Sequence, residues 1–344
     1  MINLVQFPGL GLSLHINRVA ISLGGFNIYW YGIILAAGLM GGLLFAFRYG
    51  PDFGIDTDRM VDVVVIGTVM AIVCARIYYV AMAPFQYQSL WEMIDLRNGG
   101  IAIYGALIGA FVFGGLACKW RKIPLLQMFD LVAMGFLIGQ GVGRWGNFVN
   151  QEAFGCNTTL PWGMYSEATK SYLAANAASL AAQGMTVDPT MPVHPTFLYE
   201  SLWCFAGLFM LFRFMKKRCF HGEIFLLYAV WYGCGRFWIE GLRTDSLMLS
   251  AALNLRASQL VAAVSVIIAL ALEIHFRRIY RKAPMMVNLA VADLNAYAKA
   301  FPDGVCAKAL PASASHAEFV QKTKEWNREI QEKAKSADSA QAEE

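Results

Sequence analysis

The sequence predicts an all-α polytopic membrane protein with seven transmembrane helices, and three observations lead to this fold class. Of the 344 residues, 57% are hydrophobic and only 15% are charged, and the mean hydropathy is +0.46. Soluble proteins contain about 45–50% apolar and about 25% charged residues. Charge-poor runs of about 20 residues, enough to span a bilayer, recur through roughly the first 280 positions. These features exclude a cytosolic enzyme, a disordered chain and a small secreted scaffold.

Each predicted span corresponds to one charge-poor run. The first run contains no charged residue, whereas the second, fourth and sixth are interrupted by charges such as Asp62, Asp130 and Arg236. In chain order, the predicted spans cover residues 19–47, 60–81, 99–118, 123–142, 196–215, 224–239 and 257–272.

The distribution of Lys and Arg between the loops predicts how the chain is oriented in the membrane. Basic residues gather after the first, third, fifth and seventh spans, at Arg48, Arg59, Lys119, Arg121, Lys122, Lys216, Lys217, Arg218, Arg277, Arg278, Arg281 and Lys282. The alternate loops contain fewer basic residues. Because short cytoplasmic loops carry an excess of Lys and Arg, we expect the N-terminus outside and the C-terminus in the cytoplasm.

Two polar segments are expected to lie outside the bilayer. The loop 147–195 is rich in Ala, Ser, Thr and Pro and predicts a small extracytoplasmic head, and the segment 283–344 predicts a polar cytoplasmic tail. Ser315 and Glu318 form a capping-box pattern in the tail, which favours a solvated helix over a membrane-surface or partner-binding one. The sequence thus divides into a membrane domain, 1–282, and the tail.

Composition gives no sign of a metal, a cofactor or a nucleic-acid partner. The formal net charge is only +4, which is too small to indicate nucleic acid. The seven cysteines are scattered and form neither a CxxC pair nor a metal-ligand spacing, so neither a disulfide framework nor a zinc site is expected.

Strongly polar residues within the spans converge on the predicted outer side. Arg144 and Asn147 end the fourth span, Glu200 begins the fifth, and Arg236 and Glu240 end the sixth. Ionisable groups in a membrane are costly and by default mark a functional site. A guanidinium pairs bidentately with phosphate, so several arginines with few compensating carboxylates indicate an anionic ligand.

Structural alternatives remain open for individual residues. The segment 29–31 could form an interfacial aromatic belt, and Arg76 could pair with Glu200 or Glu240. Asp130 is better explained as a helix-start or interhelical polar contact than as a catalytic group. Three further arginines could be snorkelling anchors: Arg97, Arg243 and Arg256.

The segment 141–155 is not explained by these alternatives. It reads Gly-Val-Gly-Arg-Trp-Gly-Asn-Phe-Val-Asn-Gln-Glu-Ala-Phe-Gly, with three glycines around Arg144 and polar residues at 147, 150 and 152. Glycine permits close backbone approach. The pattern therefore predicts a helix end that opens into a binding loop.

Residues 143–155 resemble the signature of the prolipoprotein diacylglyceryl transferase family. Four supporting motifs occur in the family's order, so that the resemblance covers about residues 1–280: Trp30-Tyr31-Gly32, 99–105, 194–200 and 232–240. It implies a seven-helix bundle with an extracytoplasmic head in the bacterial cytoplasmic (inner) membrane. It also implies transfer of the diacylglyceryl group of phosphatidylglycerol to the lipobox cysteine of a preprolipoprotein, the first step of lipoprotein maturation, without a cofactor.

The resemblance also assigns expected roles to individual residues. Arg144 would bind the phosphatidylglycerol headgroup, and Arg236 would stabilise the departing glycerol phosphate. The residues expected to line or support the site are Tyr31, Asn147, Glu152 and Glu240.

Two positions depart from the family pattern. Tyr104 stands where many members have a histidine assigned as the base, and Phe197 replaces a polar residue. A phenol is a poor base at neutral pH, but a thiol of pKa about 8.5 costs only about 2 kcal/mol to ionise. Stabilising a leaving phosphate is worth about 3–4 kcal/mol per preorganised donor. We therefore expect Tyr104 to orient substrate by hydrogen bonding.

Two other functions could use the same membrane bundle. A non-enzymatic protein that binds or transports an anionic lipid or solute would need a continuous polar path, whereas the polar groups here gather on one side. A seven-helix receptor would not explain the segment 141–155. The sequence therefore favours the transferase.

Overall fold

The computed structural model describes residues 2–24, 26–83, 87, 89–95, 99–218, 220–245, 248–250 and 255–280. The predicted tail, its capping box and Arg97 lie outside the described residues. The described residues fall into two compact units, one within residues 2–46 and 132–280 and the other within residues 47–131.

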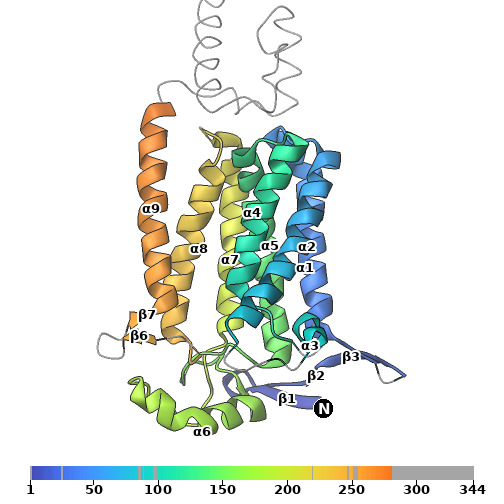
Figure 1. Cartoon of the computed structure of the whole chain (residues 1–344). Coiled ribbons are helices and arrows are strands. Elements are labelled where there is room, and N and C mark those ends of the chain that lie inside the picture. Colours follow the sequence, from blue (N-terminus) through green and yellow to red (C-terminus); the bar gives the residue numbers. More distant parts are fainter. Residues whose placement is uncertain are drawn as a thin grey trace, which may run out of the picture. The chain divides into compact units, whose positions relative to one another are not determined.

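Long helices dominate the first unit. It contains most of α1 (Trp30–Tyr49), the later part of α5 (Leu125–Asn150), α7 (Thr196–Phe214), α8 (Glu223–Leu242) and α9 (Ala257–Tyr280) (Figure 1). Glycines bring α1 and α5 close together: a Cβ on Gly38 would lie 3.3 Å from the Gly139 backbone, and one on Gly42 would lie 3.3 Å from Gly135. Small residues at such contacts are how membrane helices pack closely.

A reciprocal pair of tryptophans joins α7 to α8. The indole nitrogen of Trp203 donates to the Trp231 carbonyl and that of Trp231 to the Trp203 carbonyl, each at 2.8 Å. The rings stack with centroids 4.4 Å apart. Gly207 and Gly235 leave the space that these indoles occupy. The pair fixes α8 against α7 next to Arg236, the residue after Gly235.

Strands and a short helix form a head at one end of these helices (Figure 1). Strand β1 (Ile2–Phe7) pairs antiparallel with β2 (Leu12–Asn17) and with β5 (Tyr165–Ser166). Ser166 then caps α6 (Glu167–Ala182) through a capping box with Thr169. The core of the head includes residues from the ends of α5 and α7: Val5, Phe7, Phe148, Phe154, Met164, Leu173, Leu180, Val193 and Phe197. These shared contacts fix the head on the helix ends.

The remaining strands are short. They form two antiparallel hairpins, β3 (Val19–Leu23) with β4 (Phe26–Tyr29), and β6 (Met248–Ser250) with β7 (Leu255–Arg256). A 3₁₀ turn, η1 (Pro8–Leu10), joins β1 to β2.

The described part of the second unit contains η2 (Gly50–Phe53), α2 (Thr57–Ala81), α3 (Leu90–Ile94), α4 (Ile103–Arg121) and the start of α5. Helices α2 and α4 pack closely at Gly109, which has no side chain. A Cβ at this position would lie only 2.5 Å from the Met70 carbonyl oxygen. Arg76 donates hydrogen bonds of 2.7–2.9 Å to the carbonyls of Glu92, Met93, Gly99 and Gly100. Arg76 thus organises the segment between α2 and α4, and its guanidinium donates its hydrogen bonds to backbone carbonyls.

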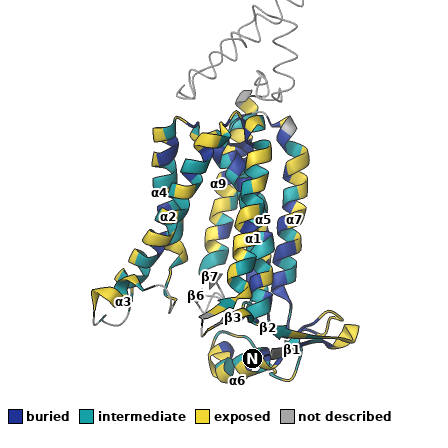
Figure 2. Cartoon of the chain, turned by 90° about the vertical axis from the view of Figure 1, so that its right-hand side faces the viewer, coloured by how far each residue is buried: buried dark blue, intermediate teal, exposed yellow. Residues whose placement is uncertain are grey.

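Six helices of the described chain are long and apolar enough to cross a membrane: Trp30–Phe53, Thr57–Ala81, Ile103–Arg121, Leu125–Asn150, Thr196–Phe214 and Ala257–Arg278. Many residues along the helices are exposed (Figure 2), and they include large apolar ones. Leu44, Ile77, Val261 and Ile267 are each more than 60% exposed. Exposed apolar side chains in this number, on helices long enough to span a bilayer, indicate contact with lipid. The chain is therefore a mostly helical integral membrane protein.

Three features of the predicted fold need correction or stay predictions. The expected span 19–47 is wrong at its start, since residues 19–29 form the β3–β4 hairpin and α1 begins at Trp30. Absence of charge does not specify a helix, and Gly24, at φ +53°, turns the chain between the strands. The all-α prediction is likewise too narrow. Helix α8 is not among the six apolar helices, so seven spans and their orientation remain predictions.

Candidate active site

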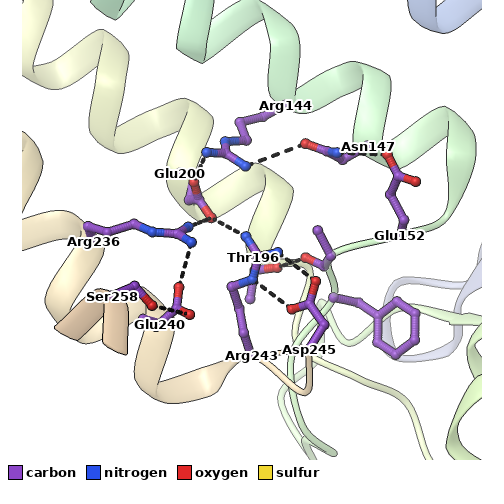
Figure 3. A network of polar contacts seen from close by, with 12 residues as sticks. Arg144, Asn147, Glu152, Thr196, Glu200, Arg236, Glu240, Arg243, Asp245 and Ser258 are labelled. Carbon is purple, nitrogen blue, oxygen red and sulfur yellow. Dashed lines mark hydrogen bonds and ion pairs between the residues drawn. The ribbon is translucent and has the colours of Figure 1, made fainter. Parts of the chain in front are cut away.

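The centre of the site is the carboxylate of Glu200, near the start of α7, with which three guanidinium groups pair (Figure 3). Arg144 Nη2 lies 2.5 Å from Glu200 Oε2, while Arg236 Nη1 and Arg243 Nη1 lie 3.3 and 3.4 Å from Oε1. The Glu200 side chain is only 5% exposed. A buried charge is tolerated when it is paired and hydrogen-bonded. Here one carboxylate pairs with an arginine of α5, an arginine of α8 and the arginine that directly follows α8.

Further acidic and polar groups hold the arginines from α8. Arg236 Nη2 lies 2.7 Å from Glu240 Oε2, and Ser258 Oγ donates to Glu240 Oε1 at 2.6 Å. Asp245 accepts two parallel bonds from Arg243, of 2.9 and 2.7 Å. Such bidentate pairing fixes the direction as well as the position of a guanidinium.

The end of α5 extends the network toward the head. Arg144 Nη1 donates to Asn147 Oδ1 at 3.5 Å, and Asn147 Nδ2 donates to Glu152 Oε1 at 2.9 Å. Gln151 and Ala153 both have positive φ angles, 55° and 56°. Non-glycine residues rarely adopt this left-handed conformation. Here it turns the chain sharply after α5, so that Glu152 reaches back to Asn147 (Figure 3).

Tyr31 lies against the same helix end. Its ring packs on Gly146, where a Cβ would come within 2.8 Å of Tyr31 Cδ2. This contact explains why the segment after Arg144 contains a glycine. Beside Tyr31 is an open pocket of about 510 Å³, lined by Arg18, Ile28, Tyr29, Tyr31, Gly32, Asn150 and Glu152.

The structure brings together most of the residues that the sequence singled out. One hydrogen-bonded network contains Arg144, Asn147, Glu152, Arg236 and Glu240 (Figure 3). Tyr104 belongs to the other unit. It lies in the first turn of α4, is 58% exposed, and its ring centroid is 6.4 Å from that of Tyr78.

The second departure from the family pattern, Phe197, has a packing role. Its ring stacks on Phe148 at 4.5 Å and meets Trp145 edge-on at 5.5 Å, and it is only 5% exposed. A polar side chain at this position would replace part of the core of the head.

Sequence reasoning missed several members of the network. Arg243 was considered as a snorkelling anchor but pairs with Glu200 and Asp245. The sequence spacing could have indicated this role, because Arg236, Glu240 and Arg243 are at positions i, i+4 and i+7, which lie on the same side of a helix. No local pattern indicated that Ser258 would reach Glu240.

The expectation of few compensating carboxylates is wrong for this cluster. Three arginines in the network, Arg144, Arg236 and Arg243, are matched by three carboxylates, Glu200, Glu240 and Asp245. An incoming phosphate must therefore compete with Glu200 for the guanidinium groups. Arg144 and Arg236, 18% and 23% exposed, are more accessible than Arg243, which is 11% exposed. No group of three or more potential metal ligands occurs among the described residues.

The Asp245–Arg243 pair predicts a pH dependence of stability. Burial raises the pKa of Asp245, but the hydrogen bonds and charge of Arg243 more than offset this, so the pKa lies below its usual range. A depressed carboxyl pKa stabilises the folded state above the unfolded pKa of about 3.9, and the contribution disappears as pH falls through the folded pKa. We expect Asp245→Asn to melt below the wild type by a constant margin from about pH 5 to 8.

Melting curves in detergent between pH 3 and 8 check this expectation. The margin should close below about pH 4. Glu167→Gln, which removes an exposed carboxylate of α6, is the matched control. A margin for Asp245→Asn that persists unchanged to pH 3 would contradict the prediction.

Comparison with known proteins shows which proteins this chain resembles. The family model described as prolipoprotein diacylglyceryl transferase matches residues 18–275. The phosphatidylglycerol–prolipoprotein diacylglyceryl transferase of Bacillus cytotoxicus is 41% identical over 263 residues, which cover 76% of this chain and 92% of that protein. Proteins of the same name from Bacillus cereus strain Q1 and Bacillus anthracis are 43% identical over the same shares of both chains.

Proposed function

The chain belongs to the prolipoprotein diacylglyceryl transferase family, and on this basis we propose that it transfers the diacylglyceryl group of phosphatidylglycerol to a prolipoprotein. The acceptor is the thiol of the lipobox cysteine in the signal peptide of a preprolipoprotein. This reaction is the first step of bacterial lipoprotein maturation. The observation that carries the proposal is the set of arginines held on one buried carboxylate at the end of the helix bundle.

The reaction exchanges one bond for another. The cysteine sulfur forms a bond to the terminal glycerol carbon of the lipid, the bond from that carbon to the phosphate oxygen breaks, and glycerol phosphate leaves. The thiol proton passes to water or to the departing glycerol phosphate, on which negative charge grows as the bond breaks. Catalysis therefore depends chiefly on groups that stabilise this charge.

We propose that Arg144 and Arg236 are the residues that interact with the phosphate of phosphatidylglycerol. Arg144 binds the headgroup and Arg236 stabilises the leaving glycerol phosphate, since both are partly exposed and project toward Glu200. Because Glu200 and Glu240 hold Arg236 in place before substrate arrives, little reorganisation is needed during the reaction. Asn147 and Glu152 support Arg144 through their hydrogen bonds, and Tyr31 lines the site.

The proposed setting is the bacterial cytoplasmic membrane, with the N-terminus outside and with α8 as a span in addition to the six apolar helices. The distribution of Lys and Arg supports this orientation. The arginine network lies at the same end of α5, α7 and α8 as the head (Figure 1). If the head is extracytoplasmic, the active site faces the side on which lipobox cysteines emerge.

Mass spectrometry of a lipobox peptide tests the proposed function. Incubation with the purified protein and phosphatidylglycerol should add the mass of one diacylglyceryl group to the peptide, and a peptide with Ser in place of Cys should stay unmodified. A protein that binds phosphatidylglycerol but leaves the cysteine peptide unchanged would instead be a binding or transport protein.

Tyr104→Phe should lower transfer by no more than about threefold. We assign Tyr104 to orienting substrate, because removal of the thiol proton needs only about 2 kcal/mol at pH 7. Initial rates at saturating phosphatidylglycerol provide the measurement. Abolished turnover in Tyr104→Phe, together with faster turnover in Tyr104→His, would show that this position acts as the base.

A further inference from the structure

A polar pair lies deeper in the helix bundle than the arginine network. From residue 131 to residue 143, α5 contains only apolar residues and glycines apart from Gln140. The Gln140 amide nitrogen, Nε2, donates to the hydroxyl of Tyr228 on α8 at 2.9 Å. Polar side chains inside a membrane are costly and by default mark a functional site. The pair therefore calls for a role of its own, since neither residue belongs to the arginine network.

Sequence spacing places this pair one to two helical turns farther from the head than the arginines. Gln140 precedes Arg144 by four residues on α5, and Tyr228 precedes Arg236 by eight residues on α8, so each residue shares the broad face of its helix with an arginine. One turn of an α-helix rises about 5.4 Å. Tyr232 lies between Tyr228 and Arg236, and its ring stacks on that of Tyr228 with centroids 5.7 Å apart. A polar layer thus follows the arginines toward the centre of the bilayer.

The Gln140–Tyr228 pair has hydrogen-bonding capacity to spare. The other amide atom of Gln140, Oε1, is buried and has no hydrogen-bond partner among the described residues. An amide also carries two N–H donors, and the bond to Tyr228 uses one of them. A half-turn of the amide lets the Tyr228 hydroxyl donate to Oε1 and places both N–H donors where Oε1 now lies. The pair can therefore offer a donor to a ligand.

A diacyl phospholipid whose phosphate is bound by the arginines brings acceptors to this depth. Its glycerol backbone separates the phosphate from two ester groups, and the acyl chains beyond the esters are apolar. An ester carbonyl accepts hydrogen bonds and donates none, so it matches the spare N–H groups of Gln140. Gln140 is partly exposed, whereas Tyr228 is buried. Gln140 is thus placed to meet the lipid, and Tyr228 to position its amide.

We propose that Gln140, positioned by Tyr228, donates a hydrogen bond to an acyl ester carbonyl of the lipid and so selects ester-linked over ether-linked lipids. This inference rests on the proposed function and adds a residue that determines which lipids the site accepts. A dialkyl lipid with ether linkages has the same headgroup and chain length but lacks both carbonyls, so it isolates this one contact.

Competition between the two kinds of lipid tests the inference. Radiolabelled diacyl phosphatidylglycerol is bound to the purified full-length protein in detergent and displaced by unlabelled diacyl or dialkyl phosphatidylglycerol. For the wild type, half-displacement should need at least fivefold more of the dialkyl lipid, as expected for the loss of one hydrogen bond. For Gln140→Leu, the two concentrations should agree within about twofold, because affinity for the diacyl lipid falls while affinity for the dialkyl lipid stays the same.

Two further variants accompany Gln140→Leu. Tyr228→Phe retains the ring that stacks on Tyr232 but loses the hydroxyl that orients the amide, so it should at least halve the preference for the diacyl lipid. This variant carries the test if Gln140→Leu does not fold. Gln259→Leu is the matched control, because the Gln259 amide donates to a carbonyl of α8, that of Phe237, at 3.0 Å. It should retain the wild-type preference.

Three results would overturn the inference. They are a wild type that binds both lipids equally, a wild-type preference in Gln140→Leu or Tyr228→Phe, and an equal loss of affinity for both lipids, which indicates that the pair only joins α5 to α8. The competition needs no peptide and is independent of transfer. A protein that shows the expected preference but leaves a lipobox peptide unmodified would refute the proposed function alone, so the two proposals fail separately.

Discussion

Arg144→Gln and Arg236→Gln are each expected to lower kcat/KM for diacylglyceryl transfer by about 10²- to 10³-fold. This range corresponds to the loss of about 3–4 kcal/mol of charge stabilisation from one preorganised donor. The corresponding lysine variants should fall between wild type and Gln, since lysine keeps the charge but lacks the fork that pairs with two oxygens. Rates of lipobox-peptide modification, measured over a range of phosphatidylglycerol concentrations, provide the test.

Arg213→Gln is the matched control for these variants. Arg213 lies at the other end of α7 from Glu200, is exposed, and contacts the ring of Phe209 at 5.2 Å. Its replacement should leave kcat/KM within about twofold of wild type, because exposed charges contribute little. Wild-type transfer by both Arg144→Gln and Arg236→Gln would remove these arginines from the mechanism.

Glu200→Gln is expected to destabilise the folded protein by about 3–5 kcal/mol, the usual cost of breaking a buried ion pair by removing one partner. The side chain is 5% exposed and lies within 3.4 Å of three guanidinium groups, so its loss leaves uncompensated positive charge in a protected site. At about 2–4 °C per kcal/mol, the melting temperature in detergent should fall by about 10 °C.

Glu167→Gln is the control for this prediction. It removes an exposed carboxylate, 75% accessible, that pairs with Lys170 at 3.3 Å, and such pairs contribute about 0–1 kcal/mol. Equal melting temperatures for Glu200→Gln and Glu167→Gln would mean that the arginines find other partners and that Glu200 does not organise the site.

The membrane-embedded helices could be predicted because their signal is local. The predicted spans 60–81 and 196–215 agree closely with Thr57–Ala81 and Thr196–Phe214, since each is a long run in which apolar residues predominate. The same signal failed at residues 19–29, which are equally apolar but form a hairpin. A hydrophobic run indicates that the segment lies in an apolar environment, but it does not by itself distinguish a helix from a strand.

The membership of the site could be predicted in part. Arg144, Glu200 and Arg236 were expected at one end of the bundle, because span length and direction place helix ends without any knowledge of contacts. Their partners could not be assigned in this way. Arg76 was a candidate partner for Glu200, but its guanidinium is occupied by carbonyls at 2.7–2.9 Å.

The sequence by itself determined that this chain is a membrane protein, where most of its helices lie, and that a few arginines within or next to its spans gather at one end of the helices. Those properties depend on composition and on rise per residue, which are local. Only the tertiary structure decided that Glu200 is the common partner of Arg144, Arg236 and Arg243. Charge pairing acts over a few ångströms between helices distant in sequence, so it is settled by how those helices pack.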